Sequence, residues 1–307
     1  MPNRTYDFIQ LDVFTQTPLA GNPLAIFPDA RGLNDAEMQA LAREMNLSET
    51  TFILPRDAAT ETREGRKVRI FTVEHELPFA GHPTLGTSLY LYASESNEKK
   101  PAEIVLDLKA GKIPVCFTAN SENAGRERVD GQVFGDMRQR DPEFGSPLSR
   151  KDVARVIGFG TDEIHSEWPI QPVSTGLTFT IVPFRNRQTL SDLKFSYIQA
   201  ADFLKETGAN FFYFLYPERR EGELEARARM FFYGGEDPAT GSAAGCAASW
   251  MVQHGVAKND ERAVIRQGLE CRRPSEIHVR ASRESERVTN VRVGGYAVEI
   301  LRGTVVL

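Results

Sequence analysis

The sequence has few cysteines and no long apolar segment. Its three cysteines, Cys116, Cys246 and Cys271, lie far apart, and no two have the C-x-x-C spacing. An odd, scattered set excludes a disulfide framework and the usual zinc-binding patterns. No apolar run approaches the ~18 residues that a membrane helix requires, and the N-terminal residues lack the apolar core of a signal peptide. We therefore expect a cytoplasmic protein that does not associate with membranes.

An excess of positive charge is also absent, as are nucleotide-binding motifs. The 37 Lys and Arg residues are outnumbered by 42 Asp and Glu, and both signs are interspersed along the chain, which argues against a nucleic-acid partner. The glycine-rich turns lack the lysine of a P-loop, and no G-x-G-x-x-G follows a strand. His75 and His82 are both near Glu76, but Pro78 prevents a single helix from carrying both histidines. We predict no metal site and no cofactor.

What the sequence does contain is a loose internal repeat. The first half predicts, in order, strands at 8–14 and 21–27, a helix capped by Asn34 or Asp35, strands at 51–54 and 68–72, and a turn at 79–83 leading into a helical stretch to 91. The second half repeats this order with strands at 175–181, 211–215 and 228–232, a helix at 197–204 between the first two, and a turn at 235–242 before a helix at 243–251. The offset is about 155 to 160 residues, a period that indicates duplicated architecture.

The last helix of the second half is built almost entirely from small or apolar residues. A helix that is apolar on every side is one enclosed by other structure. We therefore predict a central helix inside a curled sheet in each half. The composition changes over 119–150, so we place the boundary near residue 120, giving half-repeats 1–120 and 121–295. The alternating segment 296–307 is a candidate to return to the first half.

Each half presents a turn and a helix start that could hold an anion. The first N–H groups of a helix have no partner within it and lie at the positive end of its dipole, so helix starts bind anions. If the halves pack face to face, two such starts form a cleft for an anionic ligand. The polar residues near them are Gly81 and His82 at the first turn, Asp237, Thr240, Gly241 and Ser242 at the second, and Ser48 and Glu49 between the capped helix and the next strand.

Several motifs occur in order along nearly the whole chain: Asp12–Phe14 with Gly21–Pro23, Asn46–Thr50, Phe79–Gly86 and Gly235–Ala243. Together they resemble the PhzF-like family of phenazine-biosynthesis-type isomerases, whose fold is similar to that of diaminopimelate epimerase. The resemblance implies an α+β fold with two pseudo-symmetric domains, each a curled, mostly antiparallel, barrel-like sheet around a central helix. The resemblance implies an isomerase that uses no cofactor.

The resemblance also implies roles for individual residues. Glu49 matches the family's proton-shuttling glutamate, and His82 and Asp237 match its two other polar catalytic positions. Ser242 and the Gly81 backbone match substrate contacts, and we add Ser48, Thr240 and Gly241 to the substrate-binding set because they lie in the same motifs.

The chemistry implied is removal of a proton from one carbon of a small carboxylate and its return at another carbon. One carboxyl group that changes protonation state is the minimum equipment, and Glu49 is our candidate. Ser242 and the N–H groups of the second helix would hold the substrate carboxylate. The division of labour between His82 and Asp237 is left open, and a homodimer is the expected assembly.

Simpler structural interpretations exist for each residue. Glu49 could be a solvated residue at a helix end, the His82 ring could cap a backbone group, and Asp237 before Pro238 could be an ordinary helix N-cap. Two other functions also stay open. One is a racemase or epimerase of an amino-acid-like compound, although the two cysteines that such relatives carry at the helix starts are absent. The other is a non-enzymatic metabolite-binding protein.

Overall fold

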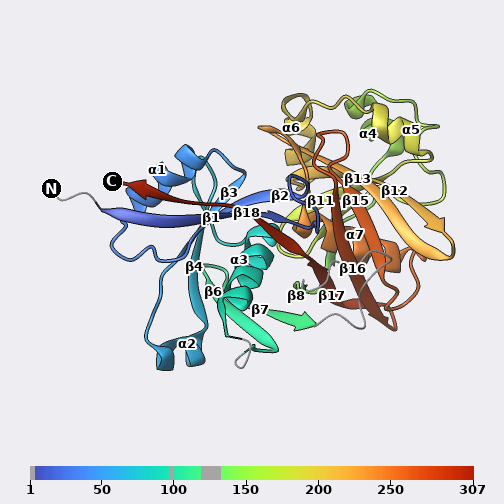
Figure 1. The fold of residues 1–307 in the computed structure, drawn as a ribbon. Helices are drawn as coiled ribbons and strands as arrows, with labels where there is room; N and C mark the ends of the chain where they lie inside the picture. Colours follow the sequence, from blue (N-terminus) through green and yellow to red (C-terminus); the bar gives the residue numbers. More distant parts are fainter. Residues whose placement is uncertain (1–3, 97–99, 119–132) are drawn as a thin grey trace. The chain divides into compact units, whose positions relative to one another are not determined.

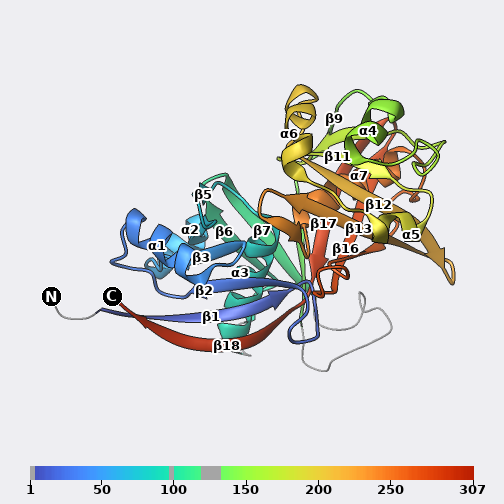
Figure 2. The same cartoon turned by 90° about the horizontal axis from the view of Figure 1, so that it is seen from above.

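The computed structural model describes residues 4–96, 100–118 and 133–307 (Figure 1). The chain divides into two compact units, unit 1 with Met1–Met137 and Gly294–Leu307, and unit 2 with Arg138–Val293. The boundary predicted near residue 120 lies outside the described residues. The C-terminal strand β18 (Ala297–Val306) pairs antiparallel with β1 (Thr5–Val13), and the two lie side by side in Figures 1 and 2. Unit 1 is thus closed by a strand from the far end of the chain.

The sheet of unit 1 mixes antiparallel pairs with two parallel ones. Its other strands are β2 (Asn22–Phe27), β3 (Glu49–Ile53), β4 (Arg66–Phe71), β5 (Glu76–Leu77), β6 (Glu103–Leu108), β7 (Gly111–Thr118) and β8 (Phe134–Arg138). The pairs β2–β3 and β4–β6 are parallel, and β1–β2, β3–β4, β4–β5, β6–β7 and β7–β8 are antiparallel. Parallel neighbours require a crossover, which here contains α1 or α3.

The sheet of unit 2 repeats this pairing scheme. Its strands are β9 (Glu143–Phe144), β10 (Gln171–Ser174), β11 (Thr178–Pro183), β12 (Phe211–Arg220), β13 (Glu223–Phe232), β14 (Gly235–Asp237), β15 (Ala263–Gln267), β16 (Ser275–Glu284) and β17 (Arg287–Gly295). The pairs β11–β12 and β13–β15 are parallel, and β10–β11, β12–β13, β13–β14 and β15–β16 are antiparallel. Strands β1 to β7 therefore match β10 to β16 in order and direction, and the repeat predicted from the sequence is confirmed.

Each unit encloses one central helix. Helix α3 (Gly81–Ser94) contacts β1, β2, β3, β6 and β7, and α7 (Gly241–Gln253) contacts β10, β11, β12 and β16. The chain just after β8 approaches α7 so closely that a Cβ at Gly245 would lie 1.9 Å from the Gln139 side chain. Small residues in α7 make this approach possible. The predicted α+β fold, a curled sheet around a central helix in each half, is confirmed.

Further helices cover the outer faces of the two sheets. In unit 1, α1 (Asp35–Met45) packs Met38 and Leu41 onto aromatic rings of β2, β3 and β4. Its N-cap is Asn34, which forms a capping box with Glu37. In unit 2, α4 (Arg150–Ile157), α5 (Arg187–Asp192) and α6 (Tyr197–Glu206) cover β11 and β12, on one side of the unit in Figure 1.

Two local expectations need correction or completion. The strand predicted at 175–181 begins only at Thr178, because Gly176 has φ +133° in the turn that follows β10. The small helix α2 (Ala58–Glu64) was not predicted at all, since it buries no residue and has no apolar face. Within the described ranges, none of the helices combines the length and hydrophobicity needed to cross a bilayer.

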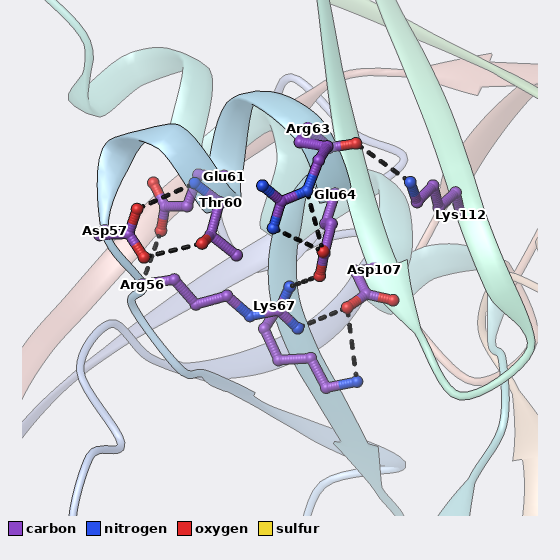
Figure 3. A network of polar contacts seen from close by, with 9 residues as sticks. All are labelled: Arg56, Asp57, Thr60, Glu61, Arg63, Glu64, Lys67, Asp107 and Lys112. Atoms are coloured by element: carbon purple, nitrogen blue, oxygen red, sulfur yellow. Dashed lines mark hydrogen bonds and ion pairs between the residues drawn. The ribbon is translucent and has the colours of Figure 1, made fainter.

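Polar contacts attach α2 to the rest of unit 1 (Figure 3). Arg56 bonds both Glu64 of α2 and Asp107 of β6, and Lys67 of β4 lies 3.6 Å from the same Asp107. Lys112 of β7 donates to the Arg63 carbonyl at 3.1 Å. These side chains are partly exposed, so we expect them to position α2 and to add little to stability.

Candidate active site

Glu49 lies at the first position of β3, just after α1 ends. Helix α1 stops at Asn46, whose left-handed backbone (φ 52°) turns the chain into the strand. Side chains alternate along a strand, so Glu49 shares a face with Thr51. Thr51 points inward, because its Oγ1 lies 3.0 Å from Oγ1 of Thr87 in α3. The Glu49 side chain is only 17% exposed and sits in a strand, so the simpler interpretation of a solvated helix end is wrong.

His82, the second residue of α3, is buried beside Glu49. Its Nε2 lies 3.6 Å from Oε2 of Glu49 and makes no hydrogen bond. The ring bonds the backbone carbonyl of Pro23 in β2, so the proton that it donates there is on Nδ1. Burial lowers the pKa of His82 to about 3, although the Pro23 carbonyl acts in the opposite direction. The ring is therefore neutral near pH 7, with its Nε2 lone pair on the side of Glu49.

This pair of groups can hold one proton on the carboxyl side. A protonated Glu49 can donate to the lone pair of Nε2, and the low pKa of the ring keeps His82 as the acceptor. Such a pair is suited to receiving a proton and giving it back. The His82 ring does bond a backbone group, as the simpler interpretation suggested, but that group belongs to the Gly21–Pro23 motif of β2 and not to the helix start.

In unit 2, Asp237 is joined to the start of α7 through Thr240. Asp237 is the last residue of β14 and is buried. Oγ1 of Thr240 donates to Oδ2 of Asp237 at 2.5 Å. The N-cap of α7 is Thr240 and the helix begins at Gly241, so the interpretation of Asp237 as an N-cap followed by Pro238 is wrong. Asp237 belongs to β14, which pairs with β13, and it therefore comes before the N-cap position of α7 in the chain.

A second polar residue holds this turn, and the sequence analysis missed it. Gln267, the last residue of β15, is completely buried. Its Oε1 accepts from the Tyr213 hydroxyl (3.0 Å) and the Thr240 N–H (3.2 Å). Its Nε2 donates to the Asp237 carbonyl (2.8 Å) and to Oγ1 of Thr240 (2.9 Å). Strand alternation was the available signal, since Ala263 and Ile265 of the same strand are also buried.

The two central helices begin without help from their N-cap side chains. The N-cap side chains of α1, α2, α4 and α5 each accept a first-turn N–H, but Ala80 of α3 and Thr240 of α7 do not, and neither does Ser196 of α6. The first-turn N–H groups of α3 and α7 are therefore not used by an N-cap side chain, a feature that α6 shares, and anion binding at these two helix starts stays a prediction.

The predicted site residues fall into two groups, one in each unit. Those of unit 1 are Ser48, Glu49, Gly81 and His82, and those of unit 2 are Asp237, Thr240, Gly241 and Ser242. The structure brings Glu49 to His82 and Asp237 to Thr240. The predicted catalytic and substrate-binding roles stay predictions. Over the described stretches, no three His, Cys, Asp or Glu residues are arranged to hold a metal ion.

Comparison with known proteins assigns the chain to a family. The model of the phenazine biosynthesis-like protein family (PhzC-PhzF) matches residues 11–303. A trans-2,3-dihydro-3-hydroxyanthranilate isomerase of Pseudomonas fluorescens is 34% identical over 98% of this chain and 100% of its own. A PhzF-family structure from Bacillus anthracis has a TM-score of 0.84 with 26% identity, covering 99% of this chain and 100% of its own.

A more distant structural relative shares the fold alone. A hydroxyproline epimerase from Agrobacterium vitis is 10% identical, with a TM-score of 0.62 over 99% of this chain and 93% of its own. The family match and the named relative are the findings that bear on activity. The chain therefore belongs to the phenazine biosynthesis-like PhzC-PhzF family and is an isomerase of the PhzF type.

Proposed function

We propose that this protein is a cofactor-independent isomerase that moves a proton between two carbons of a small carboxylate-bearing metabolite. The observation that carries the proposal is that Glu49 approaches Nε2 of the neutral His82 ring, an atom that makes no hydrogen bond. The relatives named trans-2,3-dihydro-3-hydroxyanthranilate isomerase support this compound as the first substrate to test.

Glu49 is the proposed acid and base. In its ionised form it removes a proton from one carbon, and the electron pair of the broken C–H bond shifts into the neighbouring unsaturated system. The carboxylic acid then returns the proton to a second carbon, so that no proton is gained or lost overall. His82 assists by accepting a hydrogen bond from the protonated carboxyl, which keeps the proton in place between the two steps.

The unit 2 residues are proposed to hold the substrate. The first-turn N–H groups of α7 and the hydroxyl of Ser242 would bind its carboxylate, with Thr240 and Gly241 shaping the same turn. Ser48 and the Gly81 backbone are proposed as the contacts from unit 1.

A racemase that uses two thiols has no support from the cysteines. Burial raises the pKa of Cys246 to about 11, which keeps this thiol protonated, and it lies inside α7 rather than at its start. Burial and nearby carboxylates likewise raise the pKa of Cys271 to about 11.

The test is an assay with trans-2,3-dihydro-3-hydroxyanthranilate in deuterium oxide. We expect the wild type to convert it and to place deuterium at the carbon that receives the proton. Glu49→Gln should lower turnover by at least about 10³-fold and leave substrate affinity within tenfold, because the loss is that of a general acid-base catalyst. The matched control is Glu44→Gln, an exposed carboxylate of α1 that should leave turnover unchanged.

Two outcomes would count against the proposal. If Glu49→Gln keeps wild-type turnover, another residue is the base. If the wild type converts no small carboxylate and exchanges no carbon-bound proton with solvent, the proton-transfer reaction itself is wrong. The homodimer and the cytoplasmic location stay predictions, and sedimentation analysis and fractionation of the source cells would test them.

A further inference from the structure

We propose that Gln267 is a positioning residue that, through the Thr240 hydroxyl, fixes Asp237 as a hydrogen-bond acceptor. The inference rests on the proposed function, because it assigns Asp237 the part of a constant anion, in contrast to Glu49, which changes its protonation state. Gln267 itself is completely buried and belongs to neither of the predicted groups of site residues.

The orientation of the Gln267 amide is determined by two backbone groups. The Thr240 N–H can only donate, so it requires the amide oxygen at 3.2 Å. The Asp237 carbonyl can only accept, so it requires the amide nitrogen at 2.8 Å. A flipped amide would place a donor against a donor and an acceptor against an acceptor. The Tyr213 hydroxyl, which donates to the amide oxygen at 3.0 Å, is consistent with this orientation.

The amide orientation in turn determines the direction of the Thr240 hydroxyl. Because Nε2 of Gln267 donates to Oγ1 of Thr240 at 2.9 Å, the single proton of the hydroxyl is directed elsewhere. It is directed at Oδ2 of Asp237, 2.5 Å away. The Asp237 oxygen that receives this hydrogen bond acts as the acceptor and carries no proton of its own. Hydrogen bonds of this kind to an ionised group are stronger than neutral ones, so the chain of donors favours the ionised carboxylate.

The equivalent positions of unit 1 lack this arrangement. Lys67 of β4 and Arg227 of β13 are equivalent positions of the two units. In the parallel ladders, Lys67 pairs with Asp107 of β6 and Arg227 pairs with Arg266 of β15, so Asp107 and Arg266 are equivalent as well. The next residue along β6 is Leu108, which occupies the place of Gln267. Both units build the same sheet and helix, but only unit 2 has the amide. The fold therefore does not require it, and its contacts identify Asp237 and Thr240 as what it serves.

The test measures the Asp237 carboxyl directly, in the whole protein and without substrate. Aspartate carboxyl carbons are labelled with ¹³C and titrated by NMR, and the Asp237 signal is assigned as the one lost in Asp237→Asn. The variants are Gln267→Met, Thr240→Val and Thr240→Ser. The matched control is Gln139→Met, a second buried glutamine of unit 2 that donates to the Gly241 carbonyl at 3.0 Å and bonds neither Asp237 nor Thr240.

We expect Thr240→Val to raise the titration midpoint of Asp237 by about one pH unit, a tenfold change in proton affinity, because a hydrogen bond to the charged form is lost. Gln267→Met should move it in the same direction by a smaller amount. Thr240→Ser keeps the hydroxyl and should restore the wild-type midpoint, and Gln139→Met should leave it unchanged. An unchanged midpoint in Thr240→Val, or equal shifts in Gln267→Met and Gln139→Met, would overturn the inference.

Failure of the inference and failure of the proposed function give different results. If no substrate is turned over but the midpoint shifts as expected, the proposed function fails and the role of Gln267 stands. If Glu49→Gln abolishes turnover but the titration midpoint of Asp237 does not change in the Thr240 and Gln267 variants, the function stands and the inference fails. Since Thr240→Val probes the same link from its other end, the test does not depend on Gln267→Met folding.

Discussion

The two units build the same hairpin before their central helix. In unit 1, Arg69 of β4 makes a two-bond contact with Glu76 of β5, and in unit 2, Arg229 of β13 does the same with Glu236 of β14. The two pairs are 160 residues apart in the chain, as are the first residues of α3 and α7. Each arginine also lies over a phenylalanine two residues further on, 5.0 Å and 4.8 Å from the ring centre. The scaffold of the two halves is thus repeated down to single interactions.

The residues that can carry chemistry are not repeated. Thr51 in the β3–β4 ladder and Tyr213 in the β12–β13 ladder pair with equivalent residues of β4 and β13, so they are equivalent positions. Two residues earlier in each strand, Phe211 of unit 2 occupies the place of Glu49. The hairpins likewise place Leu77 where unit 2 has Asp237. The difference teaches that one scaffold supplies two helix starts, and that each half adds a polar set of its own around one of them.

The largest difference between the two hairpins should appear when their arginines are removed. Arg229→Met leaves Glu236 buried without its partner and should cost about 3–5 kcal/mol of unfolding free energy. Arg69→Met should cost about 1–2 kcal/mol, since its side chain and that of Glu76 are 19% exposed, against 7% and 11% for Arg229 and Glu236. Arg229 also binds three carbonyls at the end of α5, at 2.8 to 3.0 Å.

Urea unfolding can measure the two effects separately. Both tryptophans, Trp168 and Trp250, lie in unit 2, so fluorescence reports that unit, and far-UV circular dichroism reports the whole chain. Arg229→Met should move the fluorescence transition to lower urea, and Arg69→Met should leave it in place. Equal losses in the two variants would mean that burial does not distinguish the hairpins.

The pH dependence of stability should sharpen the comparison from the side of unit 1. His82 binds a proton near pH 6.5 when unfolded, but only near pH 3 when folded, because burial lowers its pKa. The contribution of the neutral His82 ring to the free energy of unfolding is therefore complete above pH 6.5. It is lost as the pH falls from 6.5 to 3, and the loss is about 2 kcal/mol at pH 5.

A His82→Gln variant, which cannot take up this proton, should show a flatter loss of stability between pH 6.5 and pH 4. Urea unfolding at a series of pH values, followed by circular dichroism, gives the difference from the wild type. His75→Gln, which replaces an exposed histidine of the same unit, is the control. The same slope in the wild type and in His82→Gln would show that the buried ring does not titrate on unfolding.

The smallest effect should come from the polar network around α2, which has no counterpart before β13. Asp107→Asn removes the charge shared by Arg56 and Lys67, whose side chains are 22% and 31% exposed. We expect a loss of about 1 kcal/mol or less, which 1 M salt should remove because exposed ion pairs are screened. A loss above about 2 kcal/mol would show that the network contributes to the fold of unit 1.

The sequence predicted the fold well where patterns are long or repeated. The order of strands and helices recurs in both halves, and the small residues of α7 indicated an enclosed helix, so the architecture followed from them. Short elements were missed, as α2 shows, because a helix that buries nothing leaves no apolar period. Strand ends were displaced where a single glycine, Gly176, introduces a turn.

The candidate site was only partly predictable. Motifs predicted Glu49, His82 and Asp237 as site residues, since each lies beside a turn or a helix start, and their catalytic roles stay predictions. Pro23 and Gln267 were missed, because the first acts through its backbone carbonyl and the second reaches the turn only through strand pairing. Whether a buried glutamine at a strand end serves a neighbouring turn depends on contacts between distant segments, which no local pattern encodes.

The strand β18 has a consequence for the order in which the molecule is made. Unit 2 is continuous in the chain, but unit 1 contains both Met1–Met137 and Gly294–Leu307. On the ribosome, the second unit can reach its final structure while the first still lacks the strand that pairs with β1. The half that contains Glu49 and His82 is therefore completed only when β18 has been made, and until then the edge of β1 that β18 covers stays open to pairing with another strand.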